Sequence, residues 1–170
     1  MFRPFLRYPH PCLRTAARRV DTVDQGVRDL WDEMLAAMYA MPGHGVGLAA
    51  PQLGESRRLA VLDCSDSRDQ PIRLANPELT WASEALQAYT EASPNMPGVS
   101  AEISRPAEVE VRYLDKGGQE VSRRFDGLWA VSVQHQLDHL DGRMFVDRLG
   151  PVKRQRLLSS FRKLDKKGKR

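Results

Sequence analysis

Two histidines four residues apart, His135 and His139, have the spacing in this chain that points most directly to chemistry. Positions i and i+4 lie on one face of a helix, so the two rings can converge on one point, as two ligands of a divalent metal must. In the H-E-x-x-H pattern of metallohydrolases, a glutamate after the first histidine accepts a proton from water at the metal. Here that position holds Gln136, an amide of the same shape without useful basicity. The spacing therefore predicts the frame of a metal site whose base is missing.

The residues around the two histidines predict a buried helix over residues 127–140. Histidines at this spacing are more often incidental than metal-binding, but here the segment 128–140 is apolar nearly all round. Asp126 and Gly127 are suited to open the helix and Gly142 to end it. Imidazoles in a buried helix must find polar partners, because leaving them without hydrogen bonds costs free energy.

Length and composition predict a single domain, residues 1–170, with a sizeable core. The chain has 170 residues, of which 41% are hydrophobic and 28% are charged, as is usual for a globular protein. No N-terminal apolar segment resembles a signal sequence, and no apolar run is long enough to span a membrane. Two cysteines, Cys12 and Cys64, suit a reducing compartment better than a disulfide framework. We therefore expect a cytoplasmic monomer without membrane contact.

The positive charge of the chain is concentrated at its C-terminal end. Residues 151–170 carry nine Lys or Arg and one Asp, so that the rest of the chain is at −4 within an overall net charge of +4. The spacing of Leu157, Leu158, Phe161 and Leu164 predicts an amphipathic helix that starts near Pro151. Such a helix could contact ribosomal RNA through its basic face, or it could be a solvated face packed on its own domain.

The remaining segments predict an α+β domain with antiparallel strands. Residues 1–22 read as an irregular arm, and the apolar spacing from Val27 to Met38 predicts a helix. Strands are expected at 57–63, 72–76 and 85–89, a hairpin at 108–113 and 120–125, and a loop at 91–98 because of its two prolines. The glycine-rich stretch 43–52 lacks the spacing of a phosphate-binding loop and suggests instead a backbone that another group approaches closely.

Three motifs in order make the chain resemble the peptide deformylase family. Residues 45–52, GVGLAAPQ, resemble the motif G-x-G-L-A-A-P-Q of that family. Residues 134–145 resemble Q-H-E-x-D-H-L-x-G-x-x-F, and residues 91–98, EASPNMPG, align with E-G-C-L-S-x-P-G. A metzincin protease would instead need a third histidine where this chain has Phe145. The resemblance implies antiparallel sheets around a central buried helix that carries HQLDH.

The resemblance also implies a function and a set of roles. Members of this family remove the formyl group from the N-terminal formylmethionine of nascent chains, with Fe²⁺, Zn²⁺ or Ni²⁺ as the metal. By resemblance His135, His139 and the position of Ser93 would hold the metal. The position of Gln136 would carry the acid–base group, and Gln52 would stabilise the oxyanion.

In the same way the backbone of a substrate peptide would pair with Val46, Gly47 and Leu48 on one side and with Ala92 on the other, as an added β-strand.

The chain departs from the family at the positions that carry the chemistry. Ser93 stands in place of the cysteine ligand and is a poor ligand for a soft or borderline ion. Gln136 replaces the glutamate, and Pro94 offers no backbone N–H to an oxyanion. The departures predict a deformylase-like protein that is inactive or strongly impaired in the family reaction, with weak or absent metal binding.

Two classes of function remain open from the sequence. The first is a binder of formylated or unformylated peptide N-termini. The second is a metal-dependent amidohydrolase of altered substrate or residual deformylase activity, which acts on a small amide ligand with a different metal set that could include His44.

Overall fold

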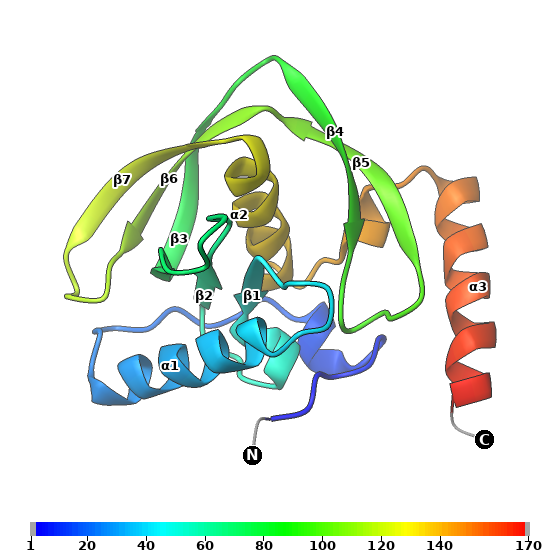
Figure 1. Ribbon diagram of the computed structural model, residues 1–170, viewed down its shortest axis with the longest axis horizontal. Coiled ribbons are helices and arrows are strands. Elements are labelled where there is room, and N and C mark those ends of the chain that lie inside the picture. Colours follow the sequence, from blue (N-terminus) through cyan, green and yellow to red (C-terminus); the bar gives the residue numbers. More distant parts are fainter. Residues whose placement is uncertain (1–2, 169–170) are drawn as a thin grey trace.

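The computed structural model describes residues 3–168, which fold into two antiparallel sheets and three α-helices (Figure 1). In chain order the elements are η1 (Pro11–Arg14), α1 (Gln25–Tyr39), β1 (Gly47–Ala49), η2 (Ala50–Leu53), β2 (Leu59–Leu62), β3 (Ile72–Ala82), β4 (Leu86–Ala92), β5 (Ser100–Pro106), β6 (Glu108–Leu114), β7 (Glu120–Asp126), α2 (Gly127–Leu140), η3 (Phe145–Arg148) and α3 (Pro151–Gly168). The α+β class, the buried helix over 127–140 and the C-terminal helix from Pro151 are confirmed.

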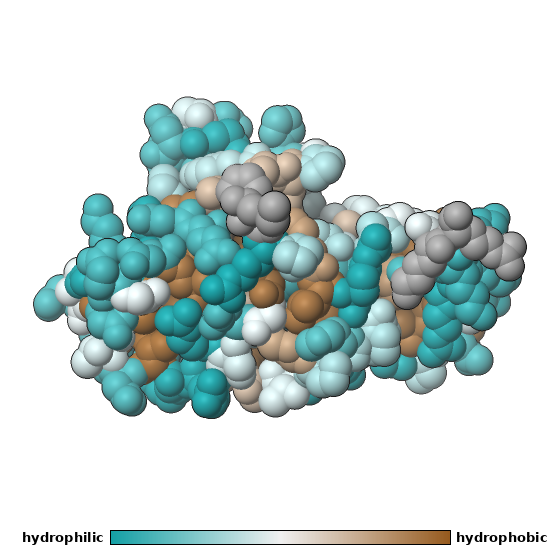
Figure 2. Space-filling model, turned by 90° about the horizontal axis from the view of Figure 1, so that it is seen from below, coloured by the Kyte–Doolittle hydropathy of each residue, from teal (hydrophilic) through white to brown (hydrophobic). Residues whose placement is uncertain are grey.

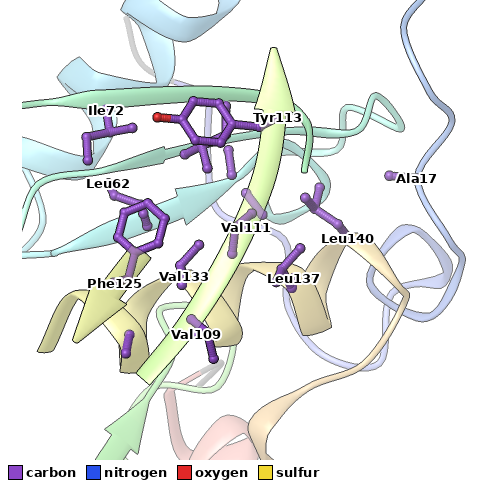
Figure 3. Packing of buried hydrophobic residues seen from close by; sticks show 14 residues of the cluster. Ala17, Leu62, Ile72, Val109, Val111, Tyr113, Phe125, Val133, Leu137 and Leu140 are labelled. Carbon is purple, nitrogen blue, oxygen red and sulfur yellow. The ribbon is translucent and has the colours of Figure 1, made fainter. Parts of the chain in front are cut away.

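The larger sheet has five strands in the order β1-β2-β3-β6-β7, so that β1 and β7 are its edges. Buried side chains of α2, among them Val133, Leu137 and Leu140, belong to one cluster with Val109 and Val111 of β6 (Figure 3). Helix α1 packs against the β1–β2 end of the sheet in a second cluster. Each buried aliphatic side chain contributes about 1.5–3 kcal/mol, so the first cluster fixes α2 firmly against the sheet and the second fixes α1.

The second sheet is the two-stranded ribbon β4-β5, which lies on the other side of α2 from β6 and β7 (Figure 1). A third hydrophobic cluster joins this ribbon to η3 and α3 through Ile103, Phe145, Leu158 and Phe161. Strands β1 and β4 are therefore edges of separate sheets, and α2 lies between the two sheets.

The structure corrects two of the expected segments. The strand β5, Ser100–Pro106, was not predicted, because its alternation is weak and it carries the buried charge Arg105. Glu91 and Ala92, expected in a loop, are the last two residues of β4, and the loop begins only at Ser93. The prolines 94 and 97 thus mark the turn after the strand and not the strand end itself.

Two further observations concern the environment of the chain. Both cysteines, Cys12 and Cys64, are free and partly buried. Within residues 3–168, no helix combines the length and the apolar character that crossing a membrane requires.

Candidate active site

A pocket of about 860 Å³ opens between the free edge of β1, the end of β4 and the start of α2. Seven of the nine residues that the sequence singled out as site residues or metal ligands line it, as does the exposed His44. These seven are Val46, Gly47, Gln52, Ala92, Ser93, His135 and Gln136. Leu48 does not, because its side chain is fully buried in the cluster under α1. His139 lies in the helix one turn beyond His135 and is buried.

Gly47 allows α2 to lie directly against β1. A Cβ atom at this position would come within 2.5 Å of the Ser132 hydroxyl and 2.7 Å of Gln136 Nε2, closer than any side chain tolerates. The Ser132 hydroxyl donates a hydrogen bond to the carbonyl of Val46 at 3.2 Å. Gly47 thus serves the close approach of a helix, which places Gln136 beside the edge of β1.

The two histidines converge as their spacing predicts. Nε2 of His139 lies 3.2 Å from Nε2 of His135, and Nδ1 of His135 lies 2.7 Å from Oε1 of Glu91. The carboxylate fixes the tautomer, because His135 must donate from Nδ1 to Glu91 and can then only accept at Nε2. His139 must donate from Nε2, which leaves its Nδ1 as a buried acceptor without a partner among residues 3–168.

The surroundings keep His139 neutral. Burial is the largest influence that lowers the pKa of His139 well below its usual value, followed by the neighbouring His135 and Arg105.

A network of buried charged side chains holds the His135 ring through Glu91. Arg105 donates to both oxygens of Glu91, at 2.7 and 2.9 Å, and to Asp138 at 3.0 Å. Arg148, which is partly exposed, donates to both oxygens of Asp138 at 2.5 and 3.0 Å. Burial by itself raises the pKa of Glu91, but the hydrogen bonds from Arg105 and His135 outweigh it and lower that pKa to about 2. The carboxylate is therefore ionised throughout the physiological range.

Opposite the histidines, Ser93 and Gln52 are joined to each other through Asn95. Gln52 Nε2 donates to Asn95 Oδ1 at 2.8 Å and, at a longer 3.5 Å, to the Ser93 hydroxyl. The Ser93 hydroxyl donates to Asn95 Oδ1 at 3.2 Å, and the backbone N–H of Asn95 donates to Ser93 Oγ at 3.3 Å. Gln52 Oε1 accepts from the backbone N–H of Ala49 at 2.9 Å. These three side chains form a closed polar ring, called the Ser93–Asn95–Gln52 ring below.

The ring is built on a β-turn that follows β4. The N–H of Met96 donates to the carbonyl of Ser93 at 3.0 Å, with Pro94 at the second position of the turn. Serine at the first position and proline at the second are favoured in such a turn.

Comparison with known proteins identifies the family. The sequence profile described as polypeptide deformylase matches residues 2–155. The chain is 41% identical to a peptide deformylase of Cellvibrio japonicus over 98% of both chains. It is 42% identical to a protein named peptide deformylase-like from Brucella melitensis, over 96% of this chain and 98% of that one.

A crystal structure of a peptide deformylase from Legionella pneumophila superposes with a TM-score of 0.91 at 34% identity, covering 100% and 99% of the two chains. The chain belongs to the polypeptide deformylase family. Members of this family are metalloenzymes that remove the formyl group from nascent peptides.

The donor set of this chain does not fit a metal of the family. Within residues 3–168 no group of three His, Cys, Asp or Glu side chains could hold an ion. The Ser93 hydroxyl is already engaged by Asn95 and Gln52. A metal at Nε2 of His139 would move the ring proton to Nδ1, where metal-bound histidines need an acceptor, and this buried Nδ1 has no partner in the described part of the chain.

Two further residues limit the chemistry that the pocket can offer. Pro94 follows Ser93 and lines the pocket, but it has no backbone N–H to donate. Gln136 is almost fully buried, and its Oε1 has no hydrogen-bond partner among the residues that the structure describes. Its amide cannot take up a proton near neutral pH.

Sequence reasoning missed the residues that support the histidines and the one that completes the ring. Glu91 and Asp138 match the family motifs, but no role was predicted for them. Arg105 lies on strand β5, which was not predicted. Asn95 replaces the serine of the family motif and carried no signal of its own.

Proposed function

We propose that this chain binds peptide N-termini in its pocket and is inactive or strongly impaired in removing a formyl group. The observation that carries the proposal is the convergence of Ser93, Pro94 and Gln136 on one pocket, in a chain whose fold matches a peptide deformylase with a TM-score of 0.91. Each of the three replaces a different part of the reaction, namely a ligand, an oxyanion donor and a base.

The typical effects of losing such groups predict a large loss in the rate of deformylation. Loss of a general acid–base group costs roughly 10²- to 10⁴-fold and loss of one oxyanion donor roughly 10²- to 10³-fold. The two factors need not multiply, because groups that act as a unit are not additive. The surviving oxyanion candidate, Gln52, directs its Nε2 to Asn95 and Ser93 and is not free to donate into the pocket.

The edges of two strands support peptide binding. β1 is an edge of the five-stranded sheet, and β4 is paired only with β5. Gly47 and Ala92 line the pocket from these two edges. An extended peptide between them could form backbone hydrogen bonds as an added strand. Apolar lining residues such as Leu128 and Val131 would receive its first side chain.

The test measures binding and turnover with the same peptide. Formyl-Met-Ala-Ser and Met-Ala-Ser are titrated by calorimetry, and release of formate from the first is followed after addition of excess protein. We expect binding of at least one peptide in the micromolar to millimolar range and formate release at least 10³-fold slower than in a peptide deformylase assayed in parallel. Formate release at the rate of that control enzyme would refute the proposal, as would the absence of binding.

The metal content separates this proposal from an amidohydrolase of altered substrate. We expect protein purified without added ions to hold less than one equivalent of Fe, Ni or Zn after dialysis. A stoichiometric ion held by His135, His139 and a third group would favour the amidohydrolase. The exposed His44 on the pocket lining would then be the first residue to replace.

The basic residues of helix α3 favour a second contact of the protein, with ribosomal RNA. Lysines and arginines are exposed along it, and hydrophilic residues cover much of it at the right of Figure 2. The exposed basic residues are Lys153, Arg156, Arg162, Lys163, Lys166 and Lys167. We expect the protein to act in the cytoplasm as a monomer and to sediment with ribosomes in a salt-dependent way. Replacing Arg162 and Lys163 by Glu should abolish co-sedimentation, and unchanged co-sedimentation would refute this contact.

A further inference from the structure

Asn95 is fully buried next to the pocket-lining residues Ser93 and Gln52, and its side chain makes hydrogen bonds to both. Its Oδ1 accepts from Gln52 and from Ser93. Its Nδ2 donates to the carbonyl of Leu6 at 2.6 Å and to the carbonyl of Gln52 at 3.1 Å. Its backbone carbonyl accepts from the N–H of Tyr8 at 3.0 Å. One side chain thus joins the turn after β4, the helical turn η2 and the N-terminal arm.

No smaller polar side chain could make these contacts. A carboxamide has two donors and an acceptor oxygen with two lone pairs, and in Asn95 all four are used. The family motif has serine at this position, whose single hydroxyl has one proton to donate and a shorter reach. The ring therefore depends on Asn95 and not on Ser93 alone.

We propose that Asn95 is a positioning residue that engages the Gln52 carboxamide and the Ser93 hydroxyl in the ring, so that neither is free to bind a group in the pocket. The inference rests on the proposed function and identifies what keeps the pocket without an oxygen ligand and without an oxyanion donor. It also means that the changes at Ser93 and Gln136 do not by themselves account for the altered site.

The side-chain amide protons of Gln52 report directly on this arrangement. In ¹⁵N-labelled full-length protein, we expect the Gln52 Nε2 protons to exchange with water at least tenfold more slowly than those of the exposed Gln155. Gln134, whose Nε2 donates to the carbonyls of Pro106 and Ala130, is the internal reference for a satisfied buried amide. Exchange of Gln52 as fast as that of Gln155 would overturn the proposal.

Two substitutions separate positioning from a purely structural role. Asn95→Ser removes the acceptor for Gln52, whereas Asn95→Asp keeps an acceptor there and loses the donors to Leu6 and Gln52. Both variants lose contacts to the N-terminal arm, so a structural role predicts the same effect from both. We expect fast exchange of the Gln52 amide only in Asn95→Ser. Equal exchange rates in the two variants would contradict the proposal, and if a variant does not fold, the measurement on the unmodified protein still decides.

Binding of Co²⁺ gives a second measure of whether the side chain at position 93 is held in the ring, and it does not depend on activity. Ser93→Cys alone places a thiol inside the ring, whereas Ser93→Cys with Asn95→Ser frees it. We expect the absorption band of a cobalt–thiolate bond to appear at a Co²⁺ concentration at least tenfold lower in the double variant. Equal affinity of the two variants would overturn the role of Asn95. Formate release by the unmodified protein would refute the proposed function but would not alter these exchange and cobalt measurements, so that the two failures are distinguishable.

Discussion

Behind His135 the pocket wall is built from charges, whereas the opposite wall is built from neutral amides and a hydroxyl. On the charged side, Glu91, Arg105 and Asp138 are each almost fully buried and each bonded to the next. Removing one member leaves a buried charge without a counter-charge, which is expensive. On the neutral side, a substitution in the Ser93–Asn95–Gln52 ring replaces one set of neutral hydrogen bonds by another, which costs little free energy.

This difference parallels where several departures from the family motifs lie, although Gln52 on the neutral side agrees with its motif. Glu91 and Asp138 agree with its motifs and support the helix, while Ser93, Pro94, Asn95 and Gln136 depart from them. The charged wall is required by the fold, because it satisfies buried groups whether or not a reaction takes place. The neutral wall holds no buried charge, so its residues can be replaced at little cost to the fold.

The largest expected effect comes from breaking the charged wall. Arg105→Met should lower the free energy of unfolding by about 3–5 kcal/mol, because Glu91 loses its arginine partner and Asp138 keeps only Arg148. Urea denaturation followed by circular dichroism measures it. Arg112→Met is the matched control, since Arg112 pairs with Glu78 at the surface and its replacement should leave the free energy of unfolding almost unchanged. Similar losses in the two variants would show that the wall is not the stabilising network described above.

Low pH should reduce the stability that the same charged wall gives to the fold. The pKa of Glu91 in the folded protein is about 2, below its ordinary value in the unfolded chain. Its ionised form therefore stabilises the fold fully above about pH 5, and this stabilisation, on the order of 2–3 kcal/mol, is lost as the pH falls toward 2.

The measurement is the free energy of unfolding between pH 6 and 3. Its decline should be shallower in Glu91→Gln than in the unmodified protein. Glu108→Gln, at an exposed position, should leave the slope unchanged. A slope unaffected by Glu91→Gln would contradict the assignment.

Much of the fold could be predicted from sequence because its signals are local. The helix that carries His135 and His139 was predicted with its observed bounds, since apolar spacing and flanking glycines act within a few residues. Strand β5 was missed because Arg105 interrupts its apolar pattern, and the partners that allow a buried arginine, Glu91 and Asp138, come from other elements.

The candidate site was predictable only in part, for the same reason. The motifs indicated which residues gather at the pocket, and seven of them line it. They could not indicate that Leu48 turns into the core, because the face that a strand residue occupies depends on the register of β1 against β2. The ring was not predictable either, since Asn95 contacts Leu6 and Gln52 across 89 and 43 residues.

A rescue series sharpens the comparison on the neutral side. Gln136→Glu alone should release no measurable formate, because no ligand set accompanies the base. Ser93→Cys, Asn95→Ser and Gln136→Glu together should restore metal content and slow turnover. Adding Pro94→Leu should raise that turnover by roughly 10- to 100-fold through the regained N–H.

The control for the proline is Pro97→Leu in the same triple background. It adds an N–H to the same loop but not next to residue 93, so turnover should not rise. Substantial formate release by the single variant Gln136→Glu would mean that the missing parts have been misassigned.

The smallest effect tests Gln136, a polar residue of the pocket that belongs to neither wall. Gln136 Oε1 is buried without a hydrogen-bond partner among residues 3–168, so the folded state carries its desolvation cost uncompensated. Methionine has nearly the same volume and no such group, and Gln136→Met should therefore raise the free energy of unfolding by about 1 kcal/mol.

Two positions earlier on α2, Gln134 donates to the carbonyls of Pro106 and Ala130. Gln134→Met should lower the free energy of unfolding by about 1 kcal/mol, because those contacts are lost. Opposite signs for the same chemical change would show that Gln136 is held in the pocket for a ligand at the expense of stability. Destabilisation by Gln136→Met equal to that by Gln134→Met would show that its amide is satisfied within the fold.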